Sequence, residues 1–347
     1  MKPPVRIGVT MGDPAGIGPE ILLAAFEKFG HSENADELQL IAIGTASVFE
    51  RVASTMSRSL HITSPNTAAA YPEMALFESA RETSPISVGQ ISGESGRLAF
   101  AAVRTAIELA MDGEIDAIVT NPISKEAINL GGHTYSGHTE ILTDLTGSSG
   151  NVMMLAHGNL RVTHMTTHMA LADVPRHITP ARLERVLGLT SAALADLGVL
   201  KPRIAVAALN PHAGEGGLFG GEDEAVLAPT IARFRSAGLD VTGPLPGDTV
   251  FVRAVGGEFD AVVAMYHDQG HIPVKLLGFR IDPATKRWVG LSGVNVTLGL
   301  PIIRTSVDHG TAFDIAGRGL ANPQSLIEAI EYAVRMVAGH RRPRTDG

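Results

Sequence analysis

The sequence predicts an α/β protein built from two domains. Short runs rich in β-branched residues alternate with longer Ala- and Leu-rich segments whose apolar residues recur three and four positions apart, the pattern of strands alternating with amphipathic helices. With 347 residues, the chain is long enough for two domains, or for one large domain split by a cleft. A cleft is the usual place for a ligand.

The expected elements follow one another along the chain. Strands are expected at 5–10, 40–43, 117–120, 203–208 and 261–264, and amphipathic helices at 98–110 and 180–197. Residues 54–91 are richer in Ser, Thr and Pro and have weak periodicity, so they predict loops and edge strands. Gly131-Gly132 and the Gly-rich stretch 214–221 predict hinges or active-site loops, because glycine permits backbone geometries that other residues forbid.

The composition excludes several classes of protein. A net charge of −8 argues against a nucleic-acid surface, which needs clustered Lys and Arg. The absence of cysteine removes disulfides, thiolate nucleophiles and Cys-ligated zinc, and leaves His, Asp and Glu as possible metal ligands. The sequence begins without the apolar region of a signal peptide, and no apolar stretch reaches the ~18 residues of a membrane span. We therefore expect a cytoplasmic protein.

Three histidines lie where predicted strands end. His168 ends a Val- and Thr-rich run, His212 follows the strand at 203–208, and His267 follows the strand at 261–264. Chemistry in α/β proteins takes place at such strand ends. Three neutral imidazoles can hold a divalent metal with one position open. The sequence therefore predicts a metal-assisted enzyme.

His164 and His168 are separated by four positions, as in the zinc-binding pairs found on helices. The surrounding Val, Thr and Met residues favour a strand instead, on which both histidines share one face. His168 lies at the strand end and is the better ligand. His164 is expected to be a core histidine.

The stretch 136–140 predicts a helix N-terminus that could bind an anion. Backbone amides and the positive end of the helix dipole suit a phosphate or a carboxylate there, although simple capping by Ser136 or Thr139 explains the pattern equally well. Lys275 and Arg304 are cations within apolar runs, which are costly positions without an anionic partner. A structural ion pair explains each alone, whereas the two together suggest a phosphorylated substrate.

Two glycine-containing loops bear on a dinucleotide site. The stretch 12–18 follows the first strand but lacks the G-x-G-x-x-G spacing of a Rossmann loop, and Pro14 would stiffen its turn. The stretch 309–319 instead resembles the adenosine-binding loop of the isocitrate and isopropylmalate dehydrogenases. That resemblance implies their two-domain α/β fold, which is not a Rossmann fold, and their metal-dependent oxidation of a secondary alcohol.

Five blocks extend the resemblance over the whole chain. They are TMGDPAGIGPE at 10–20, SGHTE at 136–140, LNPHAGE at 209–215, MYHDQG at 265–270 and VNVTLGLP at 294–301. In this order they are similar to the 4-hydroxythreonine-4-phosphate dehydrogenase family. Blocks of this length are highly specific.

The resemblance implies a complete set of site residues. A divalent metal (zinc, cobalt or magnesium) would be held by His168, His212 and His267, the last donated across the interface of a homodimer. The substrate would be bound by His138, Thr139, Lys275, Asn295 and Arg304. NAD or NADP would be bound by His309, Gly310, Thr311, Ala312 and Asp314. The first domain, 1–130 plus 301–347, would contribute the adenosine loop, and the second, 131–300, the metal ligands and the dimer contacts, with substrate and cofactor meeting in the cleft.

The implied reaction is NAD-dependent oxidation of the C3 hydroxyl of a 4-phosphorylated threonine-like acid to a 3-keto acid that loses carbon dioxide. The substrate would be 4-hydroxythreonine 4-phosphate, on the route to pyridoxine, or 4-phospho-D-threonate, because 270–279 looks closer to a branch acting on that acid. The stretch 280–292 is longer than the corresponding family loop and could change the choice. The group that accepts the hydroxyl proton stays open, with Asp248 and Lys275 as candidates.

Other functions remain as alternatives. A dehydrogenase of a cyclic dihydrodiol dicarboxylate would have less need of a phosphate anchor. A metal-dependent hydrolase would use the same three histidines without NAD, although the loop around Asp314 argues against it. A protein that binds a phosphorylated metabolite without turnover is the non-enzymatic alternative.

Overall fold

The computed structural model describes residues 3–30, 37–67, 71–286 and 288–342 of the chain. Contacts between residues divide the chain into two compact units. Unit 1 consists of the residues up to Ser149 together with Leu300–Ala338, and unit 2 of Gly150–Gly299 with the residues from Gly339 onward.

The boundaries between the units differ from those expected from the sequence, which placed the first crossing near Gly131. Residues 131–149 belong to unit 1, because α5 (His138–Thr146) buries Ile141 and Leu142 in the core of that unit. The residues from Gly339 onward belong to unit 2, where Gly339 packs against the backbone carbonyl of Asp196 so closely that a Cβ would overlap it.

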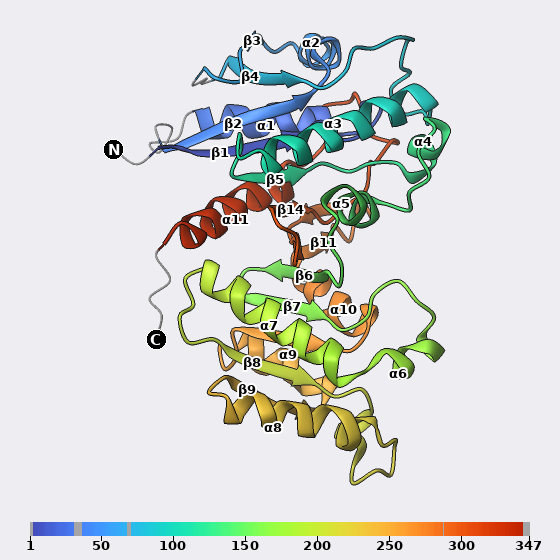
Figure 1. The fold of residues 1–347 in the computed structure, drawn as a ribbon. Helices are drawn as coiled ribbons and strands as arrows, with labels where there is room; N and C mark the ends of the chain where they lie inside the picture. Colours follow the sequence, from blue (N-terminus) through green and yellow to red (C-terminus); the bar gives the residue numbers. More distant parts are fainter. Residues whose placement is uncertain (1–2, 31–36, 68–70, 287, 343–347) are drawn as a thin grey trace. The chain divides into compact units, whose positions relative to one another are not determined.

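Unit 1 contains a sheet of parallel strands in the order β3-β4-β2-β1-β5-β14. The strands are β1 (Val5–Thr10), β2 (Leu38–Gly44), β3 (His61–Thr63), β4 (Glu73–Glu78), β5 (Ala117–Thr120) and β14 (Ile303–Val307). The helices that accompany them are α1 (Gly18–Gly30), α2 (Ala46–Thr55), α3 (Gly93–Met111), α4 (Lys125–Leu130), α5 and α11 (Gln324–His340) (Figure 1). The central strands read as nearly continuous apolar runs because a parallel sheet is covered on both faces.

Unit 2 contains a mixed sheet in the order β13-β6-β7-β10-β8-β9. The strands are β6 (Val152–His157), β7 (Leu160–His164), β8 (Arg203–Ala207), β9 (Asp240–Leu245), β10 (Ala261–Ala264) and β13 (Val294–Leu298). β6 pairs antiparallel with β13 and with β7, and the pairs β7–β10, β10–β8 and β8–β9 are parallel. The helices of this unit are α6 (Val174–His177), α7 (Pro180–Asp196), α8 (Ala228–Ser236), α9 (Gly247–Val255) and α10 (His267–Gly278) (Figure 1).

The long stretch at 280–292 is mostly a small hairpin rather than an irregular loop. Its strands, β11 (Phe279–Ile281) and β12 (Trp288–Leu291), pair antiparallel directly after α10. Arg287 lies outside the described residues.

The α/β fold class predicted from the sequence is confirmed. Each predicted strand and both predicted helices are present, and the weakly periodic stretch 54–91 supplies β3 and β4 at an edge of the unit 1 sheet. Neither unit has its strands in the order 3-2-1-4-5-6 of a Rossmann domain, and unit 2 contains antiparallel strands that such a domain lacks. Within the described ranges, no helix combines the length and apolar character that crossing a membrane requires.

Candidate functional site

Three neighbouring strands of unit 2 end at one edge of the sheet, and each is followed by a predicted metal ligand. β10 lies between β7 and β8 and pairs in parallel with both. His168 follows β7, His212 lies in a short turn after β8, and His267 is the first residue of α10 after β10. Because the carboxyl ends of parallel strands share one edge, the strand order brings the three His-bearing loops to the same end of this unit.

His168 and His267 are neighbours within one chain. Their ring centroids are 5.6 Å apart. Nδ1 of His267 lies 2.7 Å from Oδ1 of Asp268, which leaves Nε2 as the nitrogen available to a metal. A carboxylate on the far nitrogen is the usual way in which a ligating imidazole is oriented. Asp268 was not among the predicted site residues, although it directly follows a candidate ligand in the sequence.

His212 does not complete a three-residue group with this pair. Among the described residues, no three His, Asp or Glu side chains lie close enough together to hold a metal ion. His212 is exposed on its turn, which has a left-handed backbone. In donor chemistry the three imidazoles fit a borderline divalent metal, and one chain places two of the three side by side.

Two further histidines pack behind His267. The ring of His271 stacks on that of His267, with centroids 3.6 Å apart, and His164 lies beyond it, with centroids 4.8 Å apart. Burial is the main cause that lowers the pKa of His271 to about 4 and that of His164 to about 3. His164 is a buried core histidine, as expected. The contact is so close that a Cβ at Gly270 would lie 2.3 Å from Nε2 of His164, so the first turn of α10 rests directly on β7.

In unit 1, the predicted helix at 136–140 begins at His138, the first residue of α5. Neither Ser136 nor Thr139 caps it, so the capping alternative was wrong: Gly137 is the N-cap, with a φ of 155° that favours glycine. Glu140 reaches back instead, and its Oε2 accepts a hydrogen bond from the Ser136 backbone N–H at 2.7 Å.

Arg304 and His138 are two buried nitrogen-bearing side chains of unit 1. Arg304 is buried in β14, at 3% exposure, and its Nε and Nη2 donate to Oγ1 of Thr120 at 3.2 and 2.6 Å. Burial lowers the pKa of the Arg304 guanidinium to about 9. Burial and then the charge of Arg304 lower the pKa of His138 well below its usual value. Within the described part of the chain, Nε2 of His138 is buried without a hydrogen-bond partner. Buried polar groups normally have a partner, so this nitrogen is a candidate ligand contact.

The remaining predicted substrate and catalytic residues lie in unit 2. Lys275 is not the buried cation that its apolar neighbours suggested: it is partly exposed on α10, with Nζ 5.0 Å from the Phe279 ring centroid. The flanking apolar residues Ile272 and Leu276 are themselves at the surface, so this run is an exposed helix face rather than core. Asn295 lies in β13, opposite Leu155 of β6.

Two polar groups of unit 2 differ in how far they are exposed. Oδ1 of Asn295 is buried and has no hydrogen-bond partner among the described residues. Asp248 is exposed in the first turn of α9.

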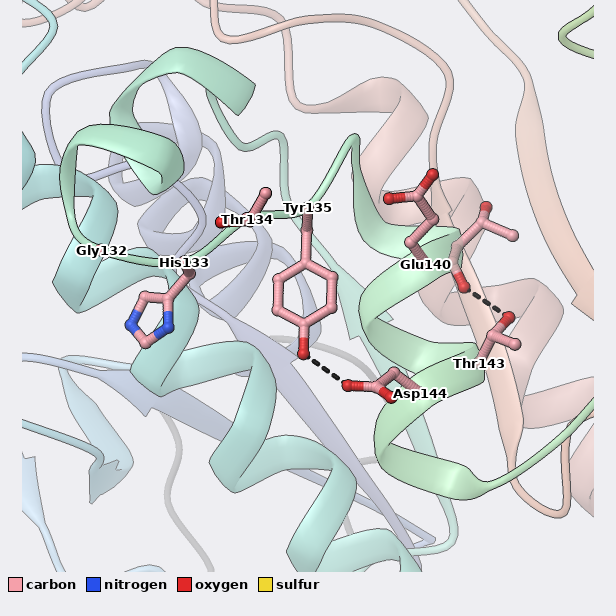
Figure 2. Close-up of a pocket in the computed structure, with 8 residues that line it drawn as sticks. Gly132, His133, Thr134, Tyr135, Glu140, Thr143 and Asp144 are labelled. Atoms are coloured by element: carbon pink, nitrogen blue, oxygen red, sulfur yellow. Dashed lines mark hydrogen bonds between the residues drawn. The ribbon is translucent and has the colours of Figure 1, made fainter.

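An open hollow of about 720 Å³ lies beside α5, at the surface of unit 1 (Figure 2). Thr139 lines it, but His138 and Arg304 do not. Its polar side chains include Glu140 and Asp144, and the Asp144 carboxylate accepts a hydrogen bond from the Tyr135 hydroxyl at 2.5 Å. Two carboxylates disfavour an anion, so the hollow is not the anion site.

The predicted cofactor residues lie in one loop of unit 1, between β14 and α11. The Thr311 carbonyl accepts a hydrogen bond from the Ile17 N–H at 3.0 Å, and Ala312 has a left-handed φ of 45°. His309 is partly buried, and burial lowers its pKa. Asp314 is exposed. The loop is therefore seated on the segment that leads into α1.

Two buried acids on that segment, Asp13 and Glu20, were not among the predicted site residues. The Glu20 carboxylate, in the first turn of α1, accepts hydrogen bonds from the Gly317 and Gly319 amides. Burial raises the pKa of Glu20. Asp13 accepts from the Ala15 amide at 2.9 Å, and burial raises the pKa of Asp13 to about 6. Both acids lie in the block at 10–20, which was considered as a dinucleotide loop and as a family motif, without a role for either carboxylate.

Comparisons with known proteins identify the family of the chain. A family profile described as "Pyridoxal phosphate biosynthetic protein PdxA" matches residues 36–333. The "Putative D-threonate 4-phosphate dehydrogenase" of Bradyrhizobium diazoefficiens is 55% identical, over 96% of this chain and 97% of that protein. A 4-hydroxythreonine-4-phosphate dehydrogenase of Beijerinckia indica is 45% identical, over 95% of this chain and 94% of that protein.

A solved structure of the same family is also similar in fold. The crystal structure of 4-hydroxythreonine-4-phosphate dehydrogenase from Klebsiella pneumoniae matches with a TM-score of 0.82 at 40% identity, over 96% of this chain and 99% of that one. Because these matches extend over nearly the whole length of each protein, the resemblance seen in the sequence blocks is confirmed. The chain belongs to the PdxA family of 4-hydroxythreonine-4-phosphate dehydrogenases and is an oxidoreductase of that family.

Proposed function

We propose that the protein is an NAD- or NADP-dependent dehydrogenase that oxidises the C3 hydroxyl of D-threonate 4-phosphate. A relative that is 55% identical bears the name of that activity, and a relative named for 4-hydroxythreonine 4-phosphate is 45% identical. The C3–H bond breaks as a hydride passes to the nicotinamide, and the hydroxyl proton passes to a base. The product is a 3-keto acid, which can then lose its carboxyl group as carbon dioxide.

The observation that carries the proposal is the pairing of Arg304 with His138 at the start of α5. A guanidinium held in place by Thr120 presents fixed N–H groups, and fixed guanidinium N–H groups suit phosphate oxygens. The lowered pKa of His138 keeps its ring neutral near pH 7, so Nε2 can bind the substrate without a second buried charge. The amide end of α5 adds a favourable dipole. Thr139, Lys275 and Asn295 are proposed as the further contacts to the substrate.

His168, His212 and His267 are the proposed holders of one divalent metal: zinc, cobalt or magnesium. When bound, such a metal lowers the pKa of an alcohol and stabilises the negative charge that develops on its oxygen. The contribution of the chain itself is orientation, because Asp268 fixes which nitrogen of His267 faces outward and His271 supports the ring from behind. Asp248 and Lys275 remain the candidates for the group that accepts the hydroxyl proton.

The loop at 309–319 is the proposed adenosine site of the cofactor. His309, Gly310, Thr311, Ala312 and Asp314 would contact it. This assignment is supported by hydrogen bonds that Glu20 and the Ile17 amide make to the loop. These bonds fix the loop conformation, so little conformational freedom is lost when a ligand binds.

A homodimer is the proposed assembly, with His267 donated by the partner. An exposed apolar face on α10 supports this: Ile272 is 64% and Leu276 is 79% exposed, and they follow His267 on the same helix. The neighbouring His168 of the same chain makes own-chain donation the competing arrangement.

Mixed dimers distinguish the two arrangements. His168→Ala and His267→Ala chains, each inactive alone, are co-expressed with different tags and the heterodimer is isolated. Donation across the interface restores one complete set of ligands and therefore about half of the wild-type activity. Own-chain donation leaves both sites broken and the heterodimer inactive.

The test of the whole function is a spectrophotometric assay of nicotinamide reduction. We expect D-threonate 4-phosphate to be turned over with a higher kcat/KM than 4-hydroxythreonine 4-phosphate, and a chelator to abolish both activities. Preference for 4-hydroxythreonine 4-phosphate would assign the protein to the branch of the family that acts on that acid. Metal-dependent turnover without nicotinamide reduction would make it a hydrolase instead.

A further inference from the structure

The turn that carries His212 is held by a buried carboxylate from a later segment of the chain. We propose that this carboxylate, Asp223, is a positioning residue that sets the affinity of the His212 site for its divalent metal. The inference deepens the proposed metal site and rests on it.

The backbone of the turn cannot hold its shape alone. His212, Ala213, Gly214 and Glu215 all have positive φ angles, of 51°, 56°, 80° and 43°. Such angles are unfavourable for residues with a Cβ, and left-handed residues ordinarily occur singly rather than four in a row. A conformation of this kind persists only where surrounding contacts enforce it.

Asp223 supplies those contacts on the side where the chain enters the turn. Its carboxylate is fully buried. Oδ1 accepts from the Leu209 N–H at 2.8 Å, and Oδ2 accepts from the N–H and the side-chain Nδ2 of Asn210, each at 3.0 Å. Hydrogen bonds to an ionised acceptor are about twice as strong as neutral ones, so three of them fix the two residues that precede the turn.

The same carboxylate also lies against the turn itself. A Cβ built on Gly214 would be 3.7 Å from Oδ2 of Asp223, in van der Waals contact. Asp223 therefore meets the backbone on both sides of His212. Asp223 is in turn fixed by its own segment, because it begins a π-helical turn, Asp223–Leu227, whose last residue is buried in the core. π-helical turns are rare and occur often at functional sites.

Loss of Asp223 should weaken metal binding more than it destabilises the metal-free fold. The turn lies at an exposed edge and buries little apolar surface, so releasing it costs the remainder of unit 2 little. Without the anchor, the four residues can relax toward right-handed backbone geometry, which turns the imidazole of His212 away. Metal binding then has to restore the strained turn. Loss of a residue that orients a metal ligand typically weakens affinity by about 10- to 100-fold.

The experiment is a titration of the full-length, metal-free protein with Co²⁺ alone, followed by the visible absorption of the bound ion. Asp223→Asn keeps the shape of the side chain but removes the charge and points an NH2 group at backbone donors. We expect it to weaken Co²⁺ binding by about 10- to 100-fold. Faster hydrogen exchange at the Leu209 and Asn210 amides should accompany the loss. Glu224→Gln is the matched control, an exposed acid one residue later, and should bind Co²⁺ as wild type does.

Each outcome has a separate meaning. Wild-type Co²⁺ affinity in a folded Asp223→Asn protein overturns the inference. If that variant does not fold, Asn210→Ala decides, since it removes the side-chain bonds of Asn210 to Asp223 and Glu222 and keeps both backbone bonds to Asp223. Unchanged affinity overturns the inference and weaker affinity supports it. The metal site itself is tested separately with wild type and His212→Ala. If wild type does not bind Co²⁺, or if His212→Ala binds it as wild type does, the proposed metal site is refuted rather than the role of Asp223.

Discussion

The hydroxyl oxygen of Thr120 accepts two hydrogen bonds from the guanidinium of Arg304, from Nε at 3.2 Å and from Nη2 at 2.6 Å. The two residues lie on neighbouring parallel strands of unit 1, so the sheet itself holds the arginine in one orientation. A buried cation that is already oriented loses little freedom when it binds an anion.

Replacing Thr120 with Val should therefore weaken binding of the phosphorylated substrate. Val has nearly the same shape and suits a strand but cannot accept the bonds. A hydrogen bond to a charged group contributes about 1.5–3 kcal/mol, so KM should rise by about tenfold or more, with a smaller change in kcat. Steady-state kinetics measures the split. Thr120→Ser keeps the oxygen and should recover most of the affinity, and an unchanged KM in Thr120→Val would show that Arg304 needs no such support.

Replacing Glu20 with Gln should weaken binding of the cofactor and spare that of the substrate. The carboxylate accepts hydrogen bonds from the Gly317 and Gly319 amides, and a Gln side chain can satisfy only one of them while placing an NH2 group against the other. We expect KM for NAD to rise by about tenfold, corresponding to about 1.4 kcal/mol. Glu27→Gln, on the same helix but paired with Arg58, is the control. Equal effects of the two changes would refute a specific role for Glu20.

The buried acid Asp13 should give stability a distinct pH dependence. Burial raises its pKa from 3.8 unfolded to about 6 folded, so the folded protein binds the proton more tightly than the unfolded chain. The contribution of this group is then fully present below about pH 4 and is lost as the pH rises through about 6. The difference amounts to about 3 kcal/mol at most.

Comparing the melting temperatures of wild type and Asp13→Asn from pH 4 to pH 7 isolates this contribution, because other groups titrate alike in both proteins. The stability of wild type relative to the variant should fall across that range. A constant difference would mean that the Asp13 carboxyl titrates normally despite its burial.

The apolar face of α10 should control assembly. Leu276→Glu places a charge on the exposed face, and we expect the protein to become a monomer with impaired Co²⁺ binding, since the partner would no longer supply His267. Val252→Glu is a matched control, 73% exposed on α9. Light scattering after size-exclusion chromatography reports the mass. A Leu276→Glu protein that stays dimeric would place the interface elsewhere.

The sequence predicted those features whose cause is local. A buried parallel strand must be apolar on both faces, so the runs before His212 and His267 marked strand ends, and the strand order then gathered them at one edge. His164 was predicted to be a core residue because it lies farther from the strand end than His168, and its burial agrees.

Features that depend on contacts between residues far apart in the chain could not be predicted from the sequence. An apolar stretch around Lys275 reads the same whether it faces a core or lies at the surface, and here it lies at the surface. A glycine pair at 131–132 indicates a bend but not which core the next helix joins, so α5 was assigned to the wrong side of the boundary. The roles of Glu20 and Asp223 depend on backbone amides that any residue could supply.

The close seating of Gly270 on His164 has a consequence for how the protein tolerates variation. A methyl group at position 270 would displace the start of α10, and His267 would move with it. In a saturation mutagenesis survey, position 270 should therefore score as intolerant as a metal ligand although it carries no side chain at all, and a catalogue built only from chemically reactive residues would overlook it.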